Sequence, residues 1–327
     1  MSFSASFSGS TRPGAPSLEV RLLREGILES RHRVHAVVVD GRGRVLMRAG
    51  DPQQLSFMRS ALKPFQATVF VSSGAAERVG CGDRGLAIAS ASHAGTALHA
   101  REAFRLLWGA ELEAGQLQCP VPQGGTSPLE HNCSGKHAAF LASCRQLHWP
   151  LESYLQPDHP LQQQVRKRVA ELLGLPEAEL VSCRDDCGAP TLQLQLSQMA
   201  LLFAHLGAGA QADLEQLSRA MLAHPELVAG EGRFDTELMR LGHGQVLSKG
   251  GAEGIQCLSR VGEGLGVAIK VEDGSARAKH AVALQLLEQL DWLTPVTLHD
   301  LRQRFLQPAP HLRLEVQGEL RFDGQSR

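Results

Sequence analysis

Residues 56–71, SFMRSALKPFQATVFV, form the stretch around which the rest of the chain is organised. Its apolar side chains recur at helical spacing, which predicts an amphipathic helix. The residues on that stripe are Phe57, Ala61, Phe65, Thr68 and Val69. Because proline is tolerated in the first turn of a helix, Pro64 predicts a helix start near Arg59 and Ser60.

Ser60 and Lys63 are the first candidates for catalysis. In a helix they lie three residues apart on one face, so their side chains can meet. A serine hydroxyl becomes a good nucleophile when a neighbouring base takes its proton. A lysine can be that base where burial or nearby positive charge keeps its amine neutral. The Ser-x-x-Lys pattern also occurs by chance on solvated helix faces, so it needs support from the rest of the chain.

The composition is that of a globular protein and excludes several classes of function. The chain has 327 residues, of which 43% are hydrophobic and 20% charged. Its net charge of -1 gives no general attraction to nucleic acid or to an anionic membrane. No apolar run approaches the roughly 20 residues of a membrane span. Tyr154 is the only tyrosine, which disfavours a binding platform built from aromatic rings.

The N-terminus and the cysteines indicate a cytoplasmic protein. Residues 1–17 are small and polar, and we expect a flexible tail there. They lack the basic start and apolar stretch of a secretory signal, so export is not supported. Seven cysteines at uneven spacing suit free thiols, metal ligands or buried apolar side chains better than a disulfide framework.

The order of predicted elements indicates one α+β domain over residues 18–327. Residues 18–50 alternate and turn at DGRG, which predicts two or three antiparallel strands. A largely helical middle follows, strands return near residue 245, and HLRLEV and ELRFDG could form a last hairpin. An antiparallel sheet closed by both ends of the chain is therefore expected. Helices are predicted over residues 84–90, 96–108, 133–147, 160–173, 190–206, 211–222, 234–241 and 276–290, and later strands over 245–249, 255–260 and 265–271.

Further stretches carry residue types that could take part in chemistry. Ser92 and His93 lie in a loop of small residues, and Lys249 comes at a strand end beside a glycine turn. Cys133 and Cys187 belong to two other motifs. The motifs, in chain order and together with that of Ser60, are RSALKP (59–64), ASHAG (91–95), NCSGKHAAF (132–140), DDCGAP (185–190) and KGGAEG (249–254).

These motifs, in this order, resemble those of the asparaginases of the Rhizobium etli type. The resemblance runs from about residue 18 nearly to the C-terminus. It implies a fold similar to serine β-lactamases, penicillin-binding proteins and glutaminases. It also implies a homodimeric amidohydrolase that converts L-asparagine to L-aspartate and ammonia.

Site residues are implied by the same resemblance. It indicates two serine–lysine pairs, Ser60 with Lys63 and Ser92 with Lys249. It also indicates a zinc site, as a structural tie or a substrate anchor. The residues implied for zinc are Cys133, Lys136 and Cys187, and those implied for the pocket lining are Arg59, His137 and Asp185. His93 is added to the pocket as the neighbour of Ser92.

The chemistry implied leaves some roles open. Ser60 is expected to attack the amide carbon while Lys63 takes its proton, with backbone N–H groups of the helix start holding the oxyanion. The Ser92–Lys249 pair is expected to pass a proton to ammonia. Ser92 could exchange roles with Ser60.

The metal ligands are open as well. Residue types alone favour Cys133, His137 and Cys187 as the ligands, or inert buried cysteines without a metal.

Two rival functions remain. One is another serine hydrolase of the same fold, either a β-lactamase or D,D-peptidase or a glutaminase. The other is a non-catalytic zinc-binding protein in which the serines cap helices. Outside the motifs, Arg277, Lys279 and His280 are expected to form a solvated helix face.

Overall fold

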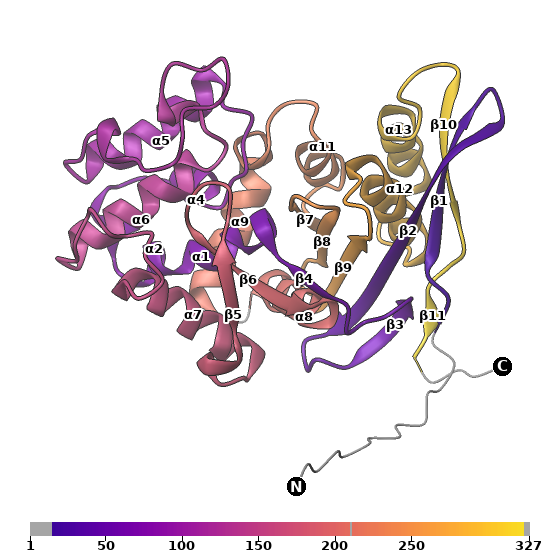
Figure 1. Cartoon of the computed structure of the whole chain (residues 1–327), viewed down its shortest axis with the longest axis horizontal. Helices are drawn as coiled ribbons and strands as arrows, with labels where there is room; N and C mark the ends of the chain where they lie inside the picture. Colours follow the sequence, from indigo (N-terminus) through magenta and orange to yellow (C-terminus); the bar gives the residue numbers. More distant parts are fainter. Residues whose placement is uncertain (1–14, 210, 324–327) are drawn as a thin grey trace, which may run out of the picture.

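Strands from both ends of the chain build one eight-stranded antiparallel sheet. The computed structural model describes residues 15–209 and 211–323. Most of the tail expected over residues 1–17 therefore lies outside the described residues. The strands run in the order β10-β1-β2-β9-β8-β7, with β3 beside β2 and β11 beside β3 (Figure 1). Their bounds are β1 Leu18–Arg24, β2 Ile27–Asp40, β3 Val45–Ala49, β7 Val246–Gly250, β8 Ile255–Arg260, β9 Leu265–Val271, β10 Leu312–Gln317 and β11 Arg321–Phe322.

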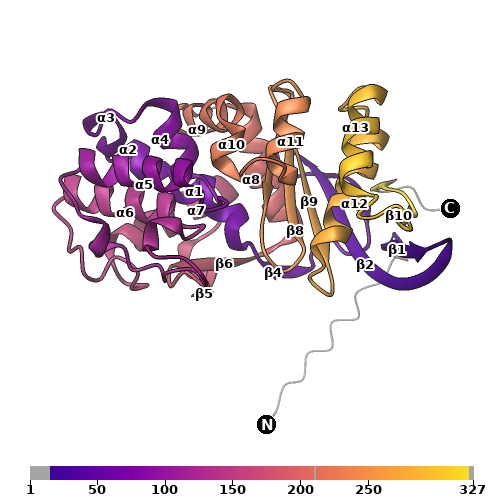
Figure 2. The same cartoon turned by 90° about the horizontal axis from the view of Figure 1, so that it is seen from above.

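The second half of the central strand β2, residues 34–39, is buried on both faces of the sheet. Val37 and Val39 belong to a core shared with the helical part of the chain. Ala36 and Val38 belong to a second core under helix α12 (Ala276–Gln289). The sheet is therefore a middle layer, with helices on both sides (Figure 2). This confirms the α+β class.

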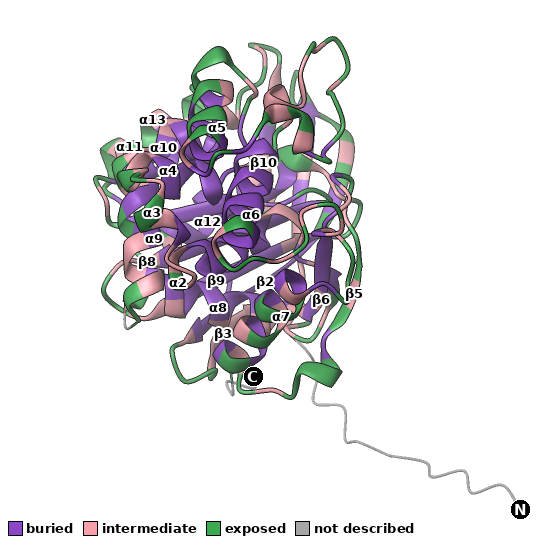
Figure 3. Ribbon diagram, turned by 90° about the vertical axis from the view of Figure 1, so that its left-hand side faces the viewer, coloured by how far each residue is buried: buried purple, intermediate pink, exposed green. Residues whose placement is uncertain are grey.

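The helical part packs against one face of the sheet through helix α8. Figure 3 shows the buried segments gathered where the helices and the sheet meet, with exposed loops outside them. Helix α13 lies with α12 on the opposite side. The bounds are α3 Ala75–Arg78, α4 Gly82–Ala89, α5 Ala97–Gly109, α6 Ser134–Gln146, α7 Pro160–Leu173, α8 Leu196–Ala208, α9 Ala212–Ala223, α10 Pro225–Val228, α11 Phe234–Leu241 and α13 Pro295–Phe305. Within residues 15–209 and 211–323, none of these helices has both the length and the apolar character needed to cross a membrane.

The prediction of one amphipathic helix over residues 56–71 is wrong. The stretch begins in strand β4 (Leu55–Phe57), continues as a 3₁₀ turn at Arg59–Leu62, and ends in the short helices α1 (Lys63–Gln66) and α2 (Thr68–Ser72). Residues 61–70 are all buried, so there is no solvated face. The left-handed backbone of Arg59, with φ of 51°, separates the strand from the turn.

A second error concerns residues 190–206, which are not one helix. They form strand β6 (Pro190–Gln195) followed by α8. Leu192 and Leu194 are buried while Gln193 is partly exposed, which is the period of a strand. Strand β6 lies between β4 and β5 (Val181–Arg184) in a separate three-stranded sheet. This small sheet interrupts the helical middle.

The expected hairpin at the end of the chain is also wrong. Strand β10 pairs with β1, and β11 pairs with β3, so neighbouring segments join different strands of the large sheet. Helix α13, which precedes them, was not among the predicted helices. Propensity alone cannot indicate these partners, since pairing across the whole chain is set by tertiary packing.

Helix α8 approaches strand β9 so closely that Gly266 has no room for a side chain. A Cβ atom there would lie 1.9 Å from the carbonyl oxygen of Ala200 and 2.6 Å from the amide nitrogen of Ala204. Because both contacts are backbone atoms, the helix must move away. We expect Gly266→Ala to lower the free energy of unfolding by about 3 kcal/mol.

Urea denaturation of the purified protein measures this effect, with Gly115→Ala as the control. Nothing lies within 4 Å of a Cβ atom at Gly115. That control should change the free energy of unfolding by less than about 0.5 kcal/mol. Equal stability of the two variants would contradict the close packing of α8 on β9.

Candidate active site

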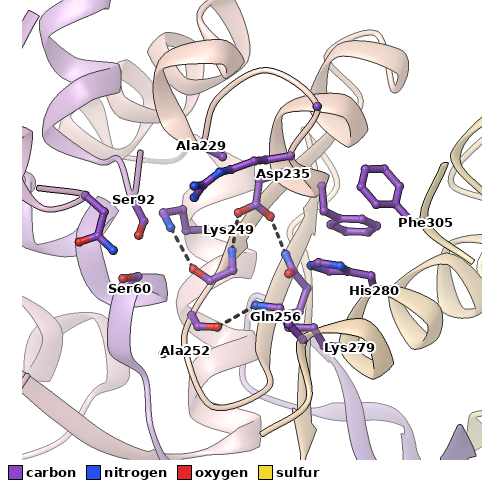
Figure 4. Close-up of a pocket in the computed structure, with 17 residues that line it drawn as sticks. Ser60, Ser92, Ala229, Asp235, Lys249, Ala252, Gln256, Lys279, His280 and Phe305 are labelled. Carbon is purple, nitrogen blue, oxygen red and sulfur yellow. Dashed lines mark hydrogen bonds between the residues drawn. The ribbon is translucent and has the colours of Figure 1, made fainter. Parts of the chain in front are cut away.

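A pocket of about 490 Å³ lies where the helical part meets strand β7. Ser60, Ser92 and Lys249 all line it. They come from the turn after β4, the loop after α4 and strand β7, and their side chains point toward one another in Figure 4. Pockets of this size suit small-molecule ligands. Of the four residues expected to be catalytic, the structure thus brings three together in one pocket.

Ser60 is held in place by strand β6. The amide of Met58 donates to Leu192 O at 2.9 Å, and the amide of Arg59 donates to Thr191 Oγ1 at 3.0 Å. These bonds fix the backbone that enters the turn. Backbone N–H groups of this turn were expected to hold an oxyanion. The amide of Ala61 is not free to do so, because it donates to Met58 O at 3.2 Å.

Lys63 lies behind the pocket wall. Its side chain is 1% exposed and its Nζ donates to Asn132 O at 3.3 Å. That carbonyl precedes Cys133 in the chain, so Lys63 lies between the serine turn and the cysteine motif. Its charge reaches both, since it lowers the pKa of Lys249 and that of Cys133. The fourth expected catalytic residue, Lys63, is therefore not among the residues that line the pocket.

Ser92 and His93 are fixed by backbone bonds to two other loops. The amide of Ser92 donates to Val228 O at 2.9 Å, and that of His93 donates to Asn132 O at 3.1 Å. The His93 ring is buried, with Nε2 3.0 Å from Ser134 Oγ and Nδ1 accepting from the amide of Gly95. Burial holds the pKa of His93 well below its ordinary value. The ring is neutral and has protein partners on both nitrogens.

Lys249 has an unusual amine. Its side chain is fully buried, and its Nζ donates to Gly250 O at 2.9 Å. Burial lowers the pKa of Lys249 to about 7, helped by the charges of Lys63 and Lys279 and opposed by Asp235. A lysine with this pKa can exchange a proton near neutral pH.

Cys133, Lys136 and Cys187 converge beside the pocket. Lys136 Nζ donates to Cys187 Sγ at 3.1 Å, and all three side chains are buried. A hydrogen bond with Cys187 lowers the pKa of Cys133 well below its usual range, with further help from Lys63 and Lys136 against burial. Burial opposes the charged form of Lys136, yet the two sulfurs raise its pKa above its ordinary value. The neighbours of Cys133 therefore favour its thiolate form.

His137 lies against this cluster and is fully buried. Its Nδ1 is 2.7 Å from the Tyr154 hydroxyl, while its Nε2 has no hydrogen-bond partner among the described residues. Burial lowers the pKa of His137 to about 4, although the neighbouring Cys187 opposes this shift. The two sulfurs and the Lys136 amine are a donor set that suits a soft divalent metal such as zinc, with His137 as a further buried group beside them.

The set of ligands suggested by residue types alone does not form. Within residues 15–209 and 211–323, no three or more His, Cys, Asp or Glu side chains are arranged to hold a metal. The combination of Cys133, His137 and Cys187 is thus disfavoured. The set of Cys133, Lys136 and Cys187 is not affected by this result, because only two of its members are of these residue types. All seven cysteines of the chain are described and are free thiols, as expected.

Arg59 and Asp185, both expected in the pocket, pair with each other. Arg59 Nε donates to Asp185 Oδ1 at 2.7 Å, and its other arm binds Asp186. The pair connects the residue before Ser60 with the turn that carries Cys187. Neither side chain is among the residues that line the pocket.

Sequence reasoning missed the wall of the pocket opposite the serines. Asp235 and Gln256 are buried there, with Lys279 and His280 of α12 close by (Figure 4). The prediction of a solvated face is wrong for Lys279, which is 8% exposed and donates to Gly251 O at 2.7 Å. The one sequence feature that could have indicated this wall is Asp235, an acidic residue in the first turn of a predicted helix that follows a glycine-rich turn.

Comparison with known proteins points to the class of amidohydrolases. The family model described as L-asparaginase II matches residues 20–322 of the chain. The protein therefore belongs to the L-asparaginase II family. No curated protein matches the chain.

Solved structures show weaker likenesses. The structure of Mglu in its native form is 13% identical, with a TM-score of 0.48, over 79% of this chain and 64% of that chain. This chain thus spans less than two thirds of the length of that Mglu chain. A β-lactamase from Mycobacterium bovis is 13% identical, with a TM-score of 0.35, over 84% of this chain and 95% of that chain.

Proposed function

We propose that the protein is an L-asparaginase, which hydrolyses L-asparagine to L-aspartate and ammonia through a serine-linked acyl intermediate. The observation that carries the proposal is that Ser60, Ser92 and Lys249 line one pocket although they are distant in the chain. The family supports an amidohydrolase. The choice of L-asparagine and of the serine mechanism is our own step beyond it.

In the acylation step, Ser60 Oγ attacks the carbon of the side-chain amide and Lys63, in its neutral form, takes the hydroxyl proton. The C–N bond then breaks, and the nitrogen leaves as ammonia after receiving a proton from the Ser92–Lys249 pair. Such a pair can serve because the pKa of Lys249 is about 7, so its amine both gives and accepts a proton near neutrality.

In the deacylation step, water attacks the ester of Ser60. Lys249 in its neutral form accepts a proton from that water through Ser92, and the ester oxygen leaves as the Ser60 hydroxyl with a proton from Lys63. The products are L-aspartate and the restored serine. Each lysine thus returns to its starting state within one turnover.

The experiment that tests the function is an ammonia-release assay on purified protein. L-Asparagine, L-glutamine and the β-lactam nitrocefin are compared at equal concentrations. The proposal expects ammonia from asparagine and no opening of nitrocefin. Turnover of nitrocefin alone would favour a β-lactamase. Faster ammonia release from glutamine than from asparagine would indicate a glutaminase. No turnover of any of the three substrates would favour a non-catalytic zinc-binding protein.

We further propose that zinc binds Cys133, Lys136 and Cys187. Support comes from the 3.1 Å contact of Lys136 with Cys187 and from the lowered pKa of Cys133, which favours its thiolate. Bound there, zinc would supply a positive charge that anchors a substrate carboxylate or ties the two loops together. The steps at Ser60 and Lys249 do not pass through it.

Removing one sulfur should abolish metal binding. We expect purified protein to contain about one zinc per chain and Cys187→Ser to contain almost none, because a thiolate is the stronger zinc ligand. Elemental analysis measures this. Cys183→Ser, which alters an exposed cysteine in the adjoining strand β5, should keep its zinc. Full zinc in Cys187→Ser, or none in the unaltered protein, would rule out this site.

The homodimer implied by the resemblance and the cytoplasmic location indicated by the N-terminus and the cysteines belong to the same proposal. Light scattering on the purified protein checks the first, and fractionation of the cells that express it checks the second.

A further inference from the structure

Asp235 is the centre of a buried hydrogen-bond network at the edge of the pocket. It lies in the first turn of α11 and its side chain is almost fully buried. Its Oδ1 accepts from Ser248 Oγ at 2.6 Å and from Gln256 Nε2 at 2.8 Å. Its Oδ2 accepts from the amide of Gly250 at 2.8 Å. Figure 4 shows the hydrogen bond between Asp235 and Gln256, close to Lys249.

These bonds hold strand β7 on both sides of one residue. Ser248 precedes Lys249 and Gly250 follows it, so a single carboxylate binds the side-chain hydroxyl before the lysine and the backbone amide after it. Gln256 ties the same carboxylate to strand β8 and also donates to Ser248 Oγ at 3.0 Å. A side chain with this support has little freedom to move, which is what a proton-transfer group needs.

The charges around Lys249 give Asp235 a second effect. The groups that face the lysine are Lys63 of α1, Lys279 of α12, the thiol of Cys133 before α6, and Asp235 itself. Burial and the two lysines favour the neutral amine, while Asp235 and Cys133 favour the charged one. Asp235 is therefore the carboxylate that favours the ammonium form of Lys249.

We propose that Asp235 is a positioning residue for Lys249, which it fixes through Ser248 and Gly250 and whose ammonium form it stabilises. The inference rests on the proposed function, because that function makes Lys249 the proton carrier. Lys279 supports the same arrangement from the other side. Its Nζ donates to Gly251 O at 2.7 Å and Ile255 O at 3.0 Å, and thereby anchors the loop that follows Lys249.

Three variants separate the charge of Asp235 from its bonds. Asp235→Asn keeps the shape and removes the charge, so the pKa of Lys249 should fall by about one unit or more. Ser248→Ala removes one bond and keeps the charge, so that pKa should move by less than about 0.3 units. Asp235→Glu keeps the charge but displaces it, so kcat should fall about tenfold.

Two readouts are used on the full-length protein. The first is the acid limb of the pH profile of kcat for L-asparagine. The second is an NMR titration of the lysine resonance that is lost in Lys249→Met, which needs no turnover. If the unaltered protein hydrolyses no amide while the titration shows the shift, the proposed function fails and the inference stands.

The inference is overturned by any of three results. One is a folded Asp235→Asn variant whose Lys249 titrates as in the unaltered protein. Another is an equal shift in Ser248→Ala, since charge would then not be the cause. The third is an unchanged kcat in Asp235→Glu, which would also decide the matter if Asp235→Asn does not fold.

Discussion

Ser60→Ala is expected to lower kcat for L-asparagine about 10⁴-fold, because the hydroxyl that forms the acyl bond is lost. Without that oxygen no covalent intermediate can form, and the remaining lysines can at best assist a direct attack by water. The measurement is ammonia release in the steady state. It is paired with intact-protein mass spectrometry after an acid quench, where the unaltered protein should carry an added aspartyl group and Ser60→Ala none.

Ser92→Ala is the decisive comparison, since Ser92 lines the same pocket. It should slow turnover yet still allow the aspartyl adduct to form. If the adduct disappears in Ser92→Ala and persists in Ser60→Ala, the two serines have exchanged roles. Ser73→Ala, at the end of α2 and away from the pocket lining, should behave as the unaltered protein.

Lys249→Met should lower kcat by 10²- to 10⁴-fold, the usual contribution of a general acid or base. The sign of the pH dependence follows from the pKa of about 7. With deacylation as the slow step, kcat of the unaltered protein should rise as the pH rises through 7, because Lys249 must be neutral to accept the proton of the attacking water. In Lys249→Met this limb should be absent from the residual activity.

The matched control is Lys270→Met. Lys270 is a partly buried lysine of strand β9 that is not among the residues lining the pocket. It should keep kcat within about twofold and keep the acid limb near pH 7. An unchanged profile in Lys249→Met would remove Lys249 from the mechanism, whatever the effect on rate.

The parts of the fold that could be predicted from the sequence are those with a local cause. Strands β8 and β9 and helices α7 and α11 have the predicted bounds, because apolar spacing and flanking glycines or prolines mark their ends. The stretch around Ser60 failed for the opposite reason. Residues 61–70 are all buried, so the apolar stripe does not separate a buried helix face from a solvent-exposed one.

The site was predictable only in so far as its motifs resemble those of a family. Ser60 and Lys63 are close in the chain, but nothing in their spacing indicates Ser92 or Lys249 as neighbours. Asp235 was missed because its partners Ser248 and Gly250 come from another element. Lys279 was placed in solvent because its carbonyl partners, such as Gly251 O, are distant in sequence. Convergence of this kind depends on tertiary packing.

The pairing of β1 with β10 and of β3 with β11 determines when the sheet can be completed during synthesis. One edge of strand β1 stays unpaired until its partner β10, residues 312–317, has left the ribosome. The helical middle of the chain can already be compact by then. Contacts between segments so distant in the chain form slowly, and an open strand edge invites pairing between molecules. A nascent chain that stalls after α12 should therefore be prone to aggregate through β1.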